Sequence, residues 1–241
     1  MLPLEVNGEV KVGRKNYPQT LPLADHEVVL TFDDGPASQT TVRVLDALRR
    51  ECVQATFFLI GRNALMHSDL VRREIAEGHT VAHHSWSHPA ATLRGLPTAA
   101  AVAEITRGMQ AVDAAGWGGE IPGGLPHVPF FRFPGFADTQ SLLAFLASRH
   151  IAVFGADLWA SDWLPMSPAS ELQLVLHRLE QSRGGILLLH DTRAQTAAML
   201  PDLLRELRLR GFRVVHVTPA PAAPRTTAIP LAAVRNTYHM H

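Results

Sequence analysis

The 241-residue chain is 46% apolar and 18% charged, a composition typical of one globular domain with at most short extensions. Lys plus Arg and Asp plus Glu both number 22, so the formal net charge is zero, and we expect no nucleic-acid partner. No run of apolar residues approaches the length of a membrane span, so we expect no membrane-spanning segment.

Residues 1–26 precede the first strongly apolar run and are interpreted as a lead-in to the domain. The segment 1–10 lacks the basic start, apolar stretch and small-residue cleavage site of a signal peptide. The protein is therefore either cytosolic, or secreted or periplasmic with its signal peptide absent from this sequence, and we favour the second alternative. The oligomeric state is not indicated.

Seven short apolar runs follow, several of them rich in Val, Ile and Phe, as buried parallel strands are. The predicted strands are Val28–Phe32, Ala55–Ile60, Thr80–His83, Phe130–Phe133, Ala152–Ala156, Ile186–His190 and Phe212–Val217. Cys52 is the only cysteine, and its position before the second run predicts a small core residue rather than a nucleophile.

Amphipathic stretches lie between most of these runs and predict helices. One predicted helix begins near Ser38 and another after Pro97. The other four span 68–77, 138–149, 167–183 and 196–210. Strands that alternate with helices indicate an α/β protein with a parallel sheet. Seven strands in about 190 residues favour a closed or nearly closed, distorted seven-stranded barrel over 27–218, with a doubly wound open sheet as the alternative. A Pro/Ala-rich stretch then leads into a tail at 219–241.

Chemically suggestive side chains recur where the predicted strands end. They are Asp33 and Asp34, His84 and His88, Arg132, Asp157 and Asp162, and His190. Active sites of parallel barrels are built at the carboxyl ends of the strands, so this distribution predicts one shared site.

His84 and His88 are four residues apart, a spacing that chelates a divalent metal if the segment turns helically. His83 could compete for the ligand role. Adjacent carboxylates at Asp33 and Asp34 repel each other unless a cation lies between them or one is protonated. Two histidines and one carboxylate form a three-ligand set that leaves positions open for water, as catalytic metal sites do.

The string Thr-Phe-Asp33-Asp34-Gly35-Pro36 resembles the first motif of the polysaccharide deacetylases, carbohydrate esterase family 4. His84-Ser85-x-x-His88 resembles their second motif, and Leu187-Leu188-Leu189-His190-Asp191 their last. Order and spacing agree over residues 28–191, and the seven predicted strands agree with the family's distorted seven-stranded barrel.

The resemblance implies a function and a role for each matching residue. Metal-activated water would attack an acetyl group on a glycan, with Asp33 as general base and His190 as general acid. Asp34, His84 and His88 would bind the metal, usually zinc, with cobalt or nickel sometimes substituting.

The resemblance also implies roles for residues around the metal ligands. Arg132 would hold Asp33, Asp162 would be tied to the acid, and Trp163 and Leu188 would wall the acetyl pocket. The backbone N–H of Gly135 would be the oxyanion donor. The family usually has an aromatic residue and then glycine after Arg-x-Pro, whereas here Gly135 precedes Phe136. The family's extra Asp, three residues before Asp162, is replaced by Trp159.

Three alternatives to glycan deacetylation remain. A relative of the same type could hydrolyse a small cyclic amide or another C–N bond, or the barrel could bind glycans without catalysis. A purely structural metal site is disfavoured because no fourth protein ligand is present. The sequence does not indicate which glycan is used, or whether the acetyl group is on nitrogen or oxygen.

Overall fold

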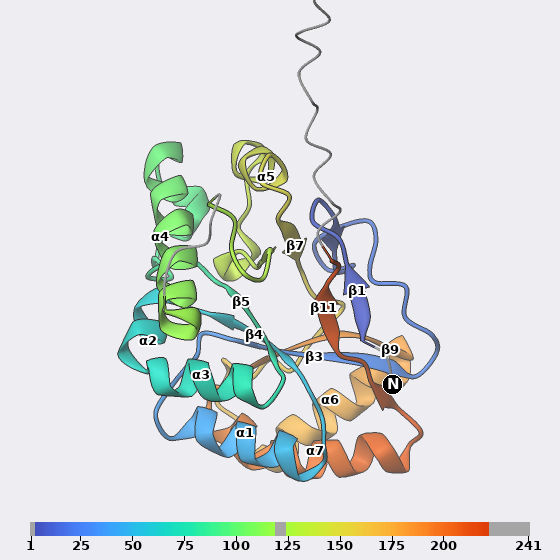
Figure 1. Cartoon of the computed structure of the whole chain (residues 1–241). Coiled ribbons are helices and arrows are strands. Elements are labelled where there is room, and N and C mark those ends of the chain that lie inside the picture. Colours follow the sequence, from blue (N-terminus) through green and yellow to red (C-terminus); the bar gives the residue numbers. More distant parts are fainter. Residues whose placement is uncertain (1–2, 119–123, 222–241) are drawn as a thin grey trace, which may run out of the picture.

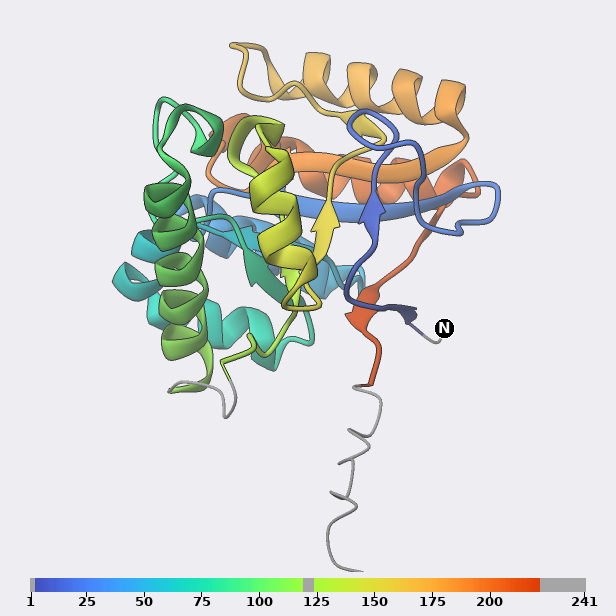
Figure 2. The same cartoon turned by 90° about the horizontal axis from the view of Figure 1, so that it is seen from above.

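The computed structural model describes residues 3–118 and 124–221, which form an α/β fold around a curled parallel sheet (Figures 1 and 2). Neighbours in the main sheet follow the order β2-β7-β6-β5-β4-β3-β9-β8, and β10 pairs with β3 beside this path. The strands of this sheet are β2 (Lys11–Val12), β3 (Glu27–Asp33), β4 (Thr56–Leu59), β5 (Thr80–His83), β6 (Phe130–Phe131), β7 (Ala152–Phe154), β8 (Leu158–Trp159), β9 (Gly184–His190) and β10 (Arg213–Val214). The predicted fold class is confirmed.

Helices cover the outside of the curl (Figure 1). They are α1 (Thr40–Arg50), α2 (Gly61–Met66), α3 (Ser68–Ala76), α4 (Thr98–Trp117), α5 (Gln140–Ala147), α6 (Pro168–Ser182) and α7 (Ala194–Leu209), with short 3-10 turns η1 (Leu93–Gly95) and η2 (Pro134–Phe136). Each predicted helix is present. The additional helix α2 was not predicted, because six residues are too few to display an amphipathic period.

Alternation along β3 places its side chains in two of the three apolar clusters of the described residues. In β3, Val28, Leu30 and Phe32 pack in the cluster that includes residues of α1 and α7, whereas Val29 packs inside the curl. Thr31 and Asp33 share the inner face with Val29, because successive side chains of a strand point to opposite faces. The register pairs Asp33 with His190 of β9. This pairing places two of the predicted site residues side by side.

The sheet departs from the predicted seven-stranded barrel in its details. β2 and β8 were not predicted, and they are the two ends of the hydrogen-bonded path, so the described sheet is curled but open. One flank of β3 is shared: Glu27 and Val28 pair with β10, and residues 31–33 pair with β4.

The last predicted strand is divided into β10 and β11 (Val217–Pro219). β11 leaves the main sheet and pairs with β1 (Leu4–Val6). Part of the lead-in is thus packed against the barrel through β1 and β2, and most of the predicted tail, 222–241, lies outside the described residues.

The expectation for Cys52 was wrong. Its side chain is exposed, and its φ of 52° places it in the turn that follows α1, four residues before β4 begins. The chain runs over the surface there before it enters the sheet, so proximity to an apolar run did not imply burial.

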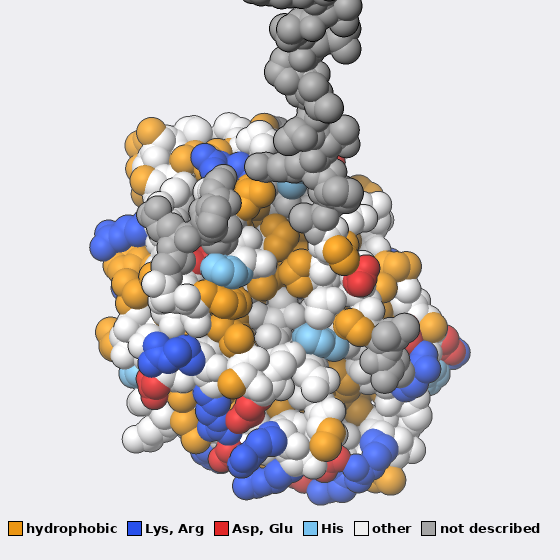
Figure 3. Space-filling model, viewed as in Figure 1, with side chains coloured by type: hydrophobic (Ala, Val, Ile, Leu, Met, Phe, Trp, Pro, Cys, Tyr) orange, Lys and Arg blue, Asp and Glu red, His pale blue; other side chains and the backbone are white. Residues whose placement is uncertain are grey.

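No helix in the described part of the chain is both long and apolar enough to cross a membrane. On the face seen in Figure 3, acidic and basic side chains are interspersed over α1 and α7 along the lower edge. Arg208 of α7 forms an ion pair with Glu51, the residue that follows α1.

Candidate functional site

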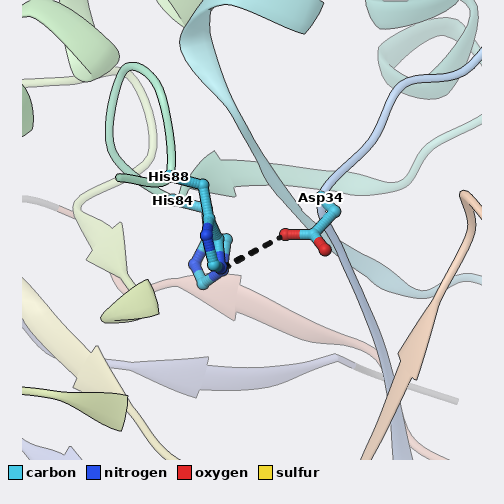
Figure 4. Close-up of side chains that lie close together, drawn as sticks. All are labelled: Asp34, His84 and His88. Carbon is cyan, nitrogen blue, oxygen red and sulfur yellow. Dashed lines mark ion pairs between the residues drawn. The ribbon is translucent and has the colours of Figure 1, made fainter. Parts of the chain in front are cut away.

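Asp34, His84 and His88 converge at the carboxyl ends of β3 and β5 (Figure 4). Each offers one ligand atom, and these atoms lie within 4.8 Å of one another. Asp34 Oδ1 is 3.6 Å from His84 Nε2 and 3.8 Å from His88 Nε2. These separations are too long for hydrogen bonds, and they leave room for a cation between the three groups.

The chemistry of these donors fits a metal. Asp34 Oδ1 is buried and accepts no hydrogen bond from a described residue, which is costly for a carboxylate oxygen without a cation. His84 Nδ1 lies 2.7 Å from the carbonyl oxygen of Arg132, a contact that orients the ring and leaves Nε2 facing Asp34. Burial lowers the pKa of His84 to about 3, so its imidazole is neutral, as a ligand must be.

The two imidazoles were predicted to converge if the segment from His84 to His88 turned helically. This segment is not helical. Ser85 and His88 instead have φ values of 65° and 50°, and the N–H of His88 donates to Ser85 Oγ at 3.1 Å. The rings nevertheless meet, with centroids 5.2 Å apart. A tight irregular loop therefore achieves what a helical turn was expected to provide.

Helix α4 holds this loop in place. The backbone N–H of Trp86 donates to the Glu104 carbonyl, and the N–H and hydroxyl of Ser87 both donate to the Glu104 carboxylate at 3.0 Å. A Cβ added at Gly108 would lie 2.4 Å from the carbonyl carbon of Ser85. Gly108 is therefore needed for the close approach of helix and loop.

Asp33 lies behind the metal ligands and is 2% exposed. Arg132, which is fully buried, donates from Nη1 to Asp33 Oδ1 at 2.7 Å and to Thr31 Oγ1 at 2.8 Å. The other oxygen, Oδ2, lies 3.8 Å from His84 Nε2. Burial raises the pKa of Asp33, and the charge of Arg132 opposes the rise. Arg132 is recognisable from the sequence as a partner of Asp33, whereas the larger effect of burial is evident only in the fold.

His190 lies on the other side of Asp34, with Nε2 3.9 Å from Asp34 Oδ2. Its Nδ1 is 2.7 Å from Asp162 Oδ1, and its backbone N–H donates to Asp162 Oδ2 at 2.7 Å. Burial alone would lower the pKa of His190, but the hydrogen bond and charge of Asp162, with the charges of Asp33 and Asp34, raise it to about 9. Two supported side chains therefore lie near Asp34: His190, held by Asp162, and Asp33, held by Arg132.

Two apolar side chains, Trp163 and Leu188, lie near His190. The ring of Trp163, 42% exposed, meets the His190 ring edge-on at 6.1 Å between centroids. Leu188 is buried and lies two residues before His190 on the same face of β9.

The turn after Pro134 carries the departure from the family motif. Gly135 and the following Phe136 both have left-handed backbone, with φ values of 58° and 54°. The N–H groups of Phe136 and Ala137 close the turn, whereas that of Gly135 donates to no described residue. The displaced aromatic ring of Phe136 is stacked on Trp159, with centroids 6.2 Å apart.

Two of the remaining candidates lie elsewhere. Asp157 accepts hydrogen bonds from the backbone of Arg14 and Ile186 near the amino end of β9, so it is not at the carboxyl rim with the other residues. His83 is buried, with Nε2 3.0 Å from the carbonyl oxygen of Val128, and it does not compete with His84. Asp157 and His83 therefore lie apart from the candidate site, although Asp162 and His84 close by in the sequence belong to it.

The family model described as polysaccharide deacetylase matches residues 21–148. The chain belongs to the polysaccharide deacetylase family. The matched residues include Asp33, Asp34, His84, His88 and Arg132, while Asp162 and His190 follow the matched segment.

Curated relatives extend the agreement. The chain is 32% identical to a peptidoglycan-N-acetylglucosamine deacetylase of Listeria monocytogenes, over 79% of this chain but only 38% of that protein. It is 33% identical to a chitooligosaccharide deacetylase of Bradyrhizobium sp. (strain ANU 289), over 83% of this chain and 92% of the relative. The chain thus spans well under half the length of the Listeria protein.

Solved structures agree in fold. A Bdellovibrio bacteriovorus peptidoglycan deacetylase superposes with a TM-score of 0.76 at 32% identity, over 88% of this chain and 56% of that one. A family 4 carbohydrate esterase from Streptomyces lividans, in complex with acetate, gives a TM-score of 0.63 at 32% identity, over 83% and 94% of the two chains.

Several residues around the site were not predicted. Asn63 donates from Nδ2 to the Asp34 carbonyl at 2.8 Å, and Asp191 is so close to Gly35 that a Cβ there would lie 2.2 Å from its carboxylate. Neither Asn63 in α2 nor Glu104 in α4 carries a local sequence signal. The only available hint was Asp191, which belongs to the last motif.

Proposed function

We propose that this protein is a metal-dependent deacetylase that hydrolyses N-acetyl, or O-acetyl, groups on an acetylated poly- or oligosaccharide. The observation that supports this most directly is the orphaned, buried Oδ1 of Asp34 between two imidazoles. The carboxyl group of Asp33, held by Arg132, and the imidazole of His190, held by Asp162, flank it. We take residues 27–218 as the catalytic unit, with 1–26 as a lead-in and 219–241 as a tail.

Asp34, His84 and His88 would hold the cation, and two nitrogen donors with one carboxylate favour zinc, with cobalt or nickel also compatible. When bound, such an ion supplies Lewis acidity: it lowers the pKa of water from about 15.7 toward 7 and polarises a carbonyl.

The chain's own residues would divide the proton transfers. Asp33, held through Oδ1 by Arg132, keeps Oδ2 available to accept a proton from water. His190, protonated by virtue of Asp162, would donate from Nε2 to the departing amine or alcohol. The N–H of Gly135, which has no partner among the described residues, would donate to the oxyanion, and Trp163 and Leu188 would enclose the acetyl methyl group.

The substrate class rests on the relatives, whose names refer to peptidoglycan N-acetylglucosamine and to chitooligosaccharides. An acetylated glycan of one of these types is therefore the proposed substrate. Hydrolysis of a small cyclic amide, and a glycan-binding barrel without catalysis, are the competing outcomes.

Acetate release from a panel of acetylated glycans, with an aryl acetate in parallel, tests the proposal. We expect release that a chelator abolishes and that added Zn²⁺ restores. His84→Ala should lose both bound metal and activity, because one of three ligands is gone. His177→Ala, in helix α6 and outside the site, is the matched control. Turnover that is insensitive to chelator would refute the proposal, and metal content that survives His84→Ala would refute the ligand assignment.

A further inference from the structure

A chain of buried hydrogen bonds extends behind His190, away from the metal ligands. Asp162 binds His190 through both oxygens, and Asp162 Oδ2 also lies 2.9 Å from Thr196 Oγ1. The same hydroxyl oxygen lies 2.8 Å from Glu171 Oε1. Asp162, Thr196 and Glu171 come from the loop after β8, from α7 and from α6, and each is at most 1% exposed.

The number of protons in this chain is constrained. The Thr196 hydroxyl has one proton and lies between two carboxyl groups. Asp162 accepts from the backbone N–H of His190 on Oδ2, and His190, whose pKa is raised to about 9, donates from Nδ1 to Oδ1, so both oxygens of Asp162 act as acceptors. The Thr196 proton then belongs to the bond with Asp162. The short contact to Glu171 requires a second proton, and only Glu171 can carry it.

The surroundings of Glu171 favour that protonated form. Its other oxygen, Oε2, is buried and accepts no hydrogen bond from a described residue. No ion pair with a cationic side chain is formed by Glu171 among the described residues, and the charged groups that act on it are Asp162 and His190. Burial raises the pKa of Glu171 to about 7, and the charge of Asp162 adds to the rise, while Thr196 and His190 oppose it.

We propose that Glu171 is a positioning residue that, as a neutral acid, donates through Thr196 to Asp162 and so fixes the carboxylate that orients His190. The proposal rests on the proposed function only for its catalytic consequence, which is donation by His190 to the leaving group. The hydrogen-bond chain itself is a property of the folded protein.

Donation from Glu171 through Thr196 to Asp162 fixes the position of the Asp162 carboxylate. An ionised Glu171 would place a second negative charge against Asp162 and would compete for the single Thr196 proton. The neutral acid instead supplies a proton, so Asp162 keeps two donors on Oδ2 and one on Oδ1. This arrangement holds the carboxylate in one rotamer behind the imidazole.

The kinetic test compares variants of Thr196. Thr196→Val removes the hydroxyl at nearly constant shape and should lower kcat on an N-acetylated glycan by about 10- to 100-fold, with metal content and KM little changed. The loss should be much smaller on an aryl acetate, whose leaving group needs no proton. Thr196→Ser should restore most of the activity. Thr56→Val is the control, because Thr56 is also buried but its hydroxyl has no hydrogen-bond partner.

The protonation test does not depend on activity. The infrared difference spectrum of the metal-loaded wild type minus Glu171→Gln at about pH 6, one unit below the pKa of about 7, should contain a carboxylic-acid carbonyl band, since the other buried acids are common to both proteins. Glu171→Gln should keep kcat within about threefold, because its amide can donate to Thr196, whereas Glu171→Leu should match the loss in Thr196→Val.

Each outcome decides one question. An unchanged acid band in Glu171→Gln, or equal losses on both substrates in Thr196→Val, would overturn the positioning role. Absence of any deacetylation by the wild-type protein would overturn the proposed function, while the infrared comparison would still decide whether Glu171 is neutral.

Discussion

Asp33 has its two oxygens in different surroundings: one accepts from the guanidinium of Arg132, and the other faces the metal ligands. Its burial raises its pKa and the charge of the fully buried Arg132 opposes the rise, so Arg132 is the group that would keep Asp33 competent as the proposed base. Arg132 is itself held by the carbonyl oxygens of Phe154 and Gly155.

Asp33→Asn tests this division at the residue scale. The variant should retain its metal, because Asp34, His84 and His88 are untouched, and should lose about 100- to 10,000-fold in kcat for want of a base. Metal content by elemental analysis and acetate release are the measurements. Turnover near the wild-type rate would disprove the assignment of the base.

Asp162→Asn tests the acid through the pH profile. The negative charge of Asp162 favours protonated His190 and raises its pKa to about 9, so the acid form is lost as the pH rises through that value. Without the charge the pKa falls, and the alkaline decline of kcat/KM should begin roughly 1–3 pH units lower. An alkaline limb that coincides with that of the wild type, or of the exposed control Asp69→Asn, would contradict the assignment.

Helix α4 determines at the element scale where His84 and His88 can meet. The loop that carries them has two residues in left-handed conformation and is held by backbone and side-chain bonds to Glu104. Packing of this loop against Gly108 requires the absence of a side chain there. The helix therefore contributes to the metal site although it supplies no ligand.

Gly108→Ala should displace the loop and weaken Zn²⁺ binding by about 10- to 100-fold, the usual effect of disturbing the groups that orient metal ligands. Competition with a chromophoric chelator measures the affinity. Gly116→Ala in the same helix is the control, since its Cβ would meet only the side chains of Ile75 and Val71. Equal affinities in the two variants would show that α4 does not position the histidines.

At the scale of the whole molecule, one buried carboxyl group makes the stability of the fold depend on pH. Glu74 of α3 is fully buried, and neither of its carboxylate oxygens has a hydrogen-bond partner among the described residues. Burial raises its pKa well above 4.5, and the charge of Asp191 adds to the rise. The unfolded chain releases this proton first as the pH increases, so the group lowers the stability of the fold above about pH 4.5.

Glu74→Gln should remove this pH-dependent cost. The free energy of unfolding should rise relative to wild type by about 1.4 kcal/mol for each pH unit above the unfolded-state pKa, until the folded-state group ionises. Urea denaturation at about pH 5 and about pH 8 measures the difference. The exposed Glu5→Gln is the control, and a gain that does not depend on pH would show that Glu74 is ionised in the folded state.

Local patterns were sufficient for much of the fold and for the composition of the site. Alternating or continuous apolar runs located seven strands, because a buried strand requires apolar side chains along its length. His84, His88 and the pair Asp33 and Asp34 could be chosen because they follow strand ends, and parallel strands end at one rim. Only the family resemblance distinguished Asp34 as the carboxylate ligand. The three motifs added roles that residue types alone did not distinguish.

Other features depended on contacts between residues far apart in the chain. The exposure of Cys52 and the open path from β2 to β8 became evident only in the fold, and the non-helical loop at 84–88 packs against α4, which has no local signal for that contact. Asp157 lies five residues from Asp162 in sequence, yet their side chains serve opposite ends of β9.

By itself the sequence determined which side chains could bind a metal and exchange protons, since residue type and position relative to a strand end decide both. Only the tertiary structure decided how these groups are supported: Arg132 behind Asp33, and Asp162, Thr196 and Glu171 behind His190. The physical reason is that a pKa or a proton position depends on burial and on neighbours within a few ångströms, and those neighbours are brought together by the fold rather than by the order of the chain.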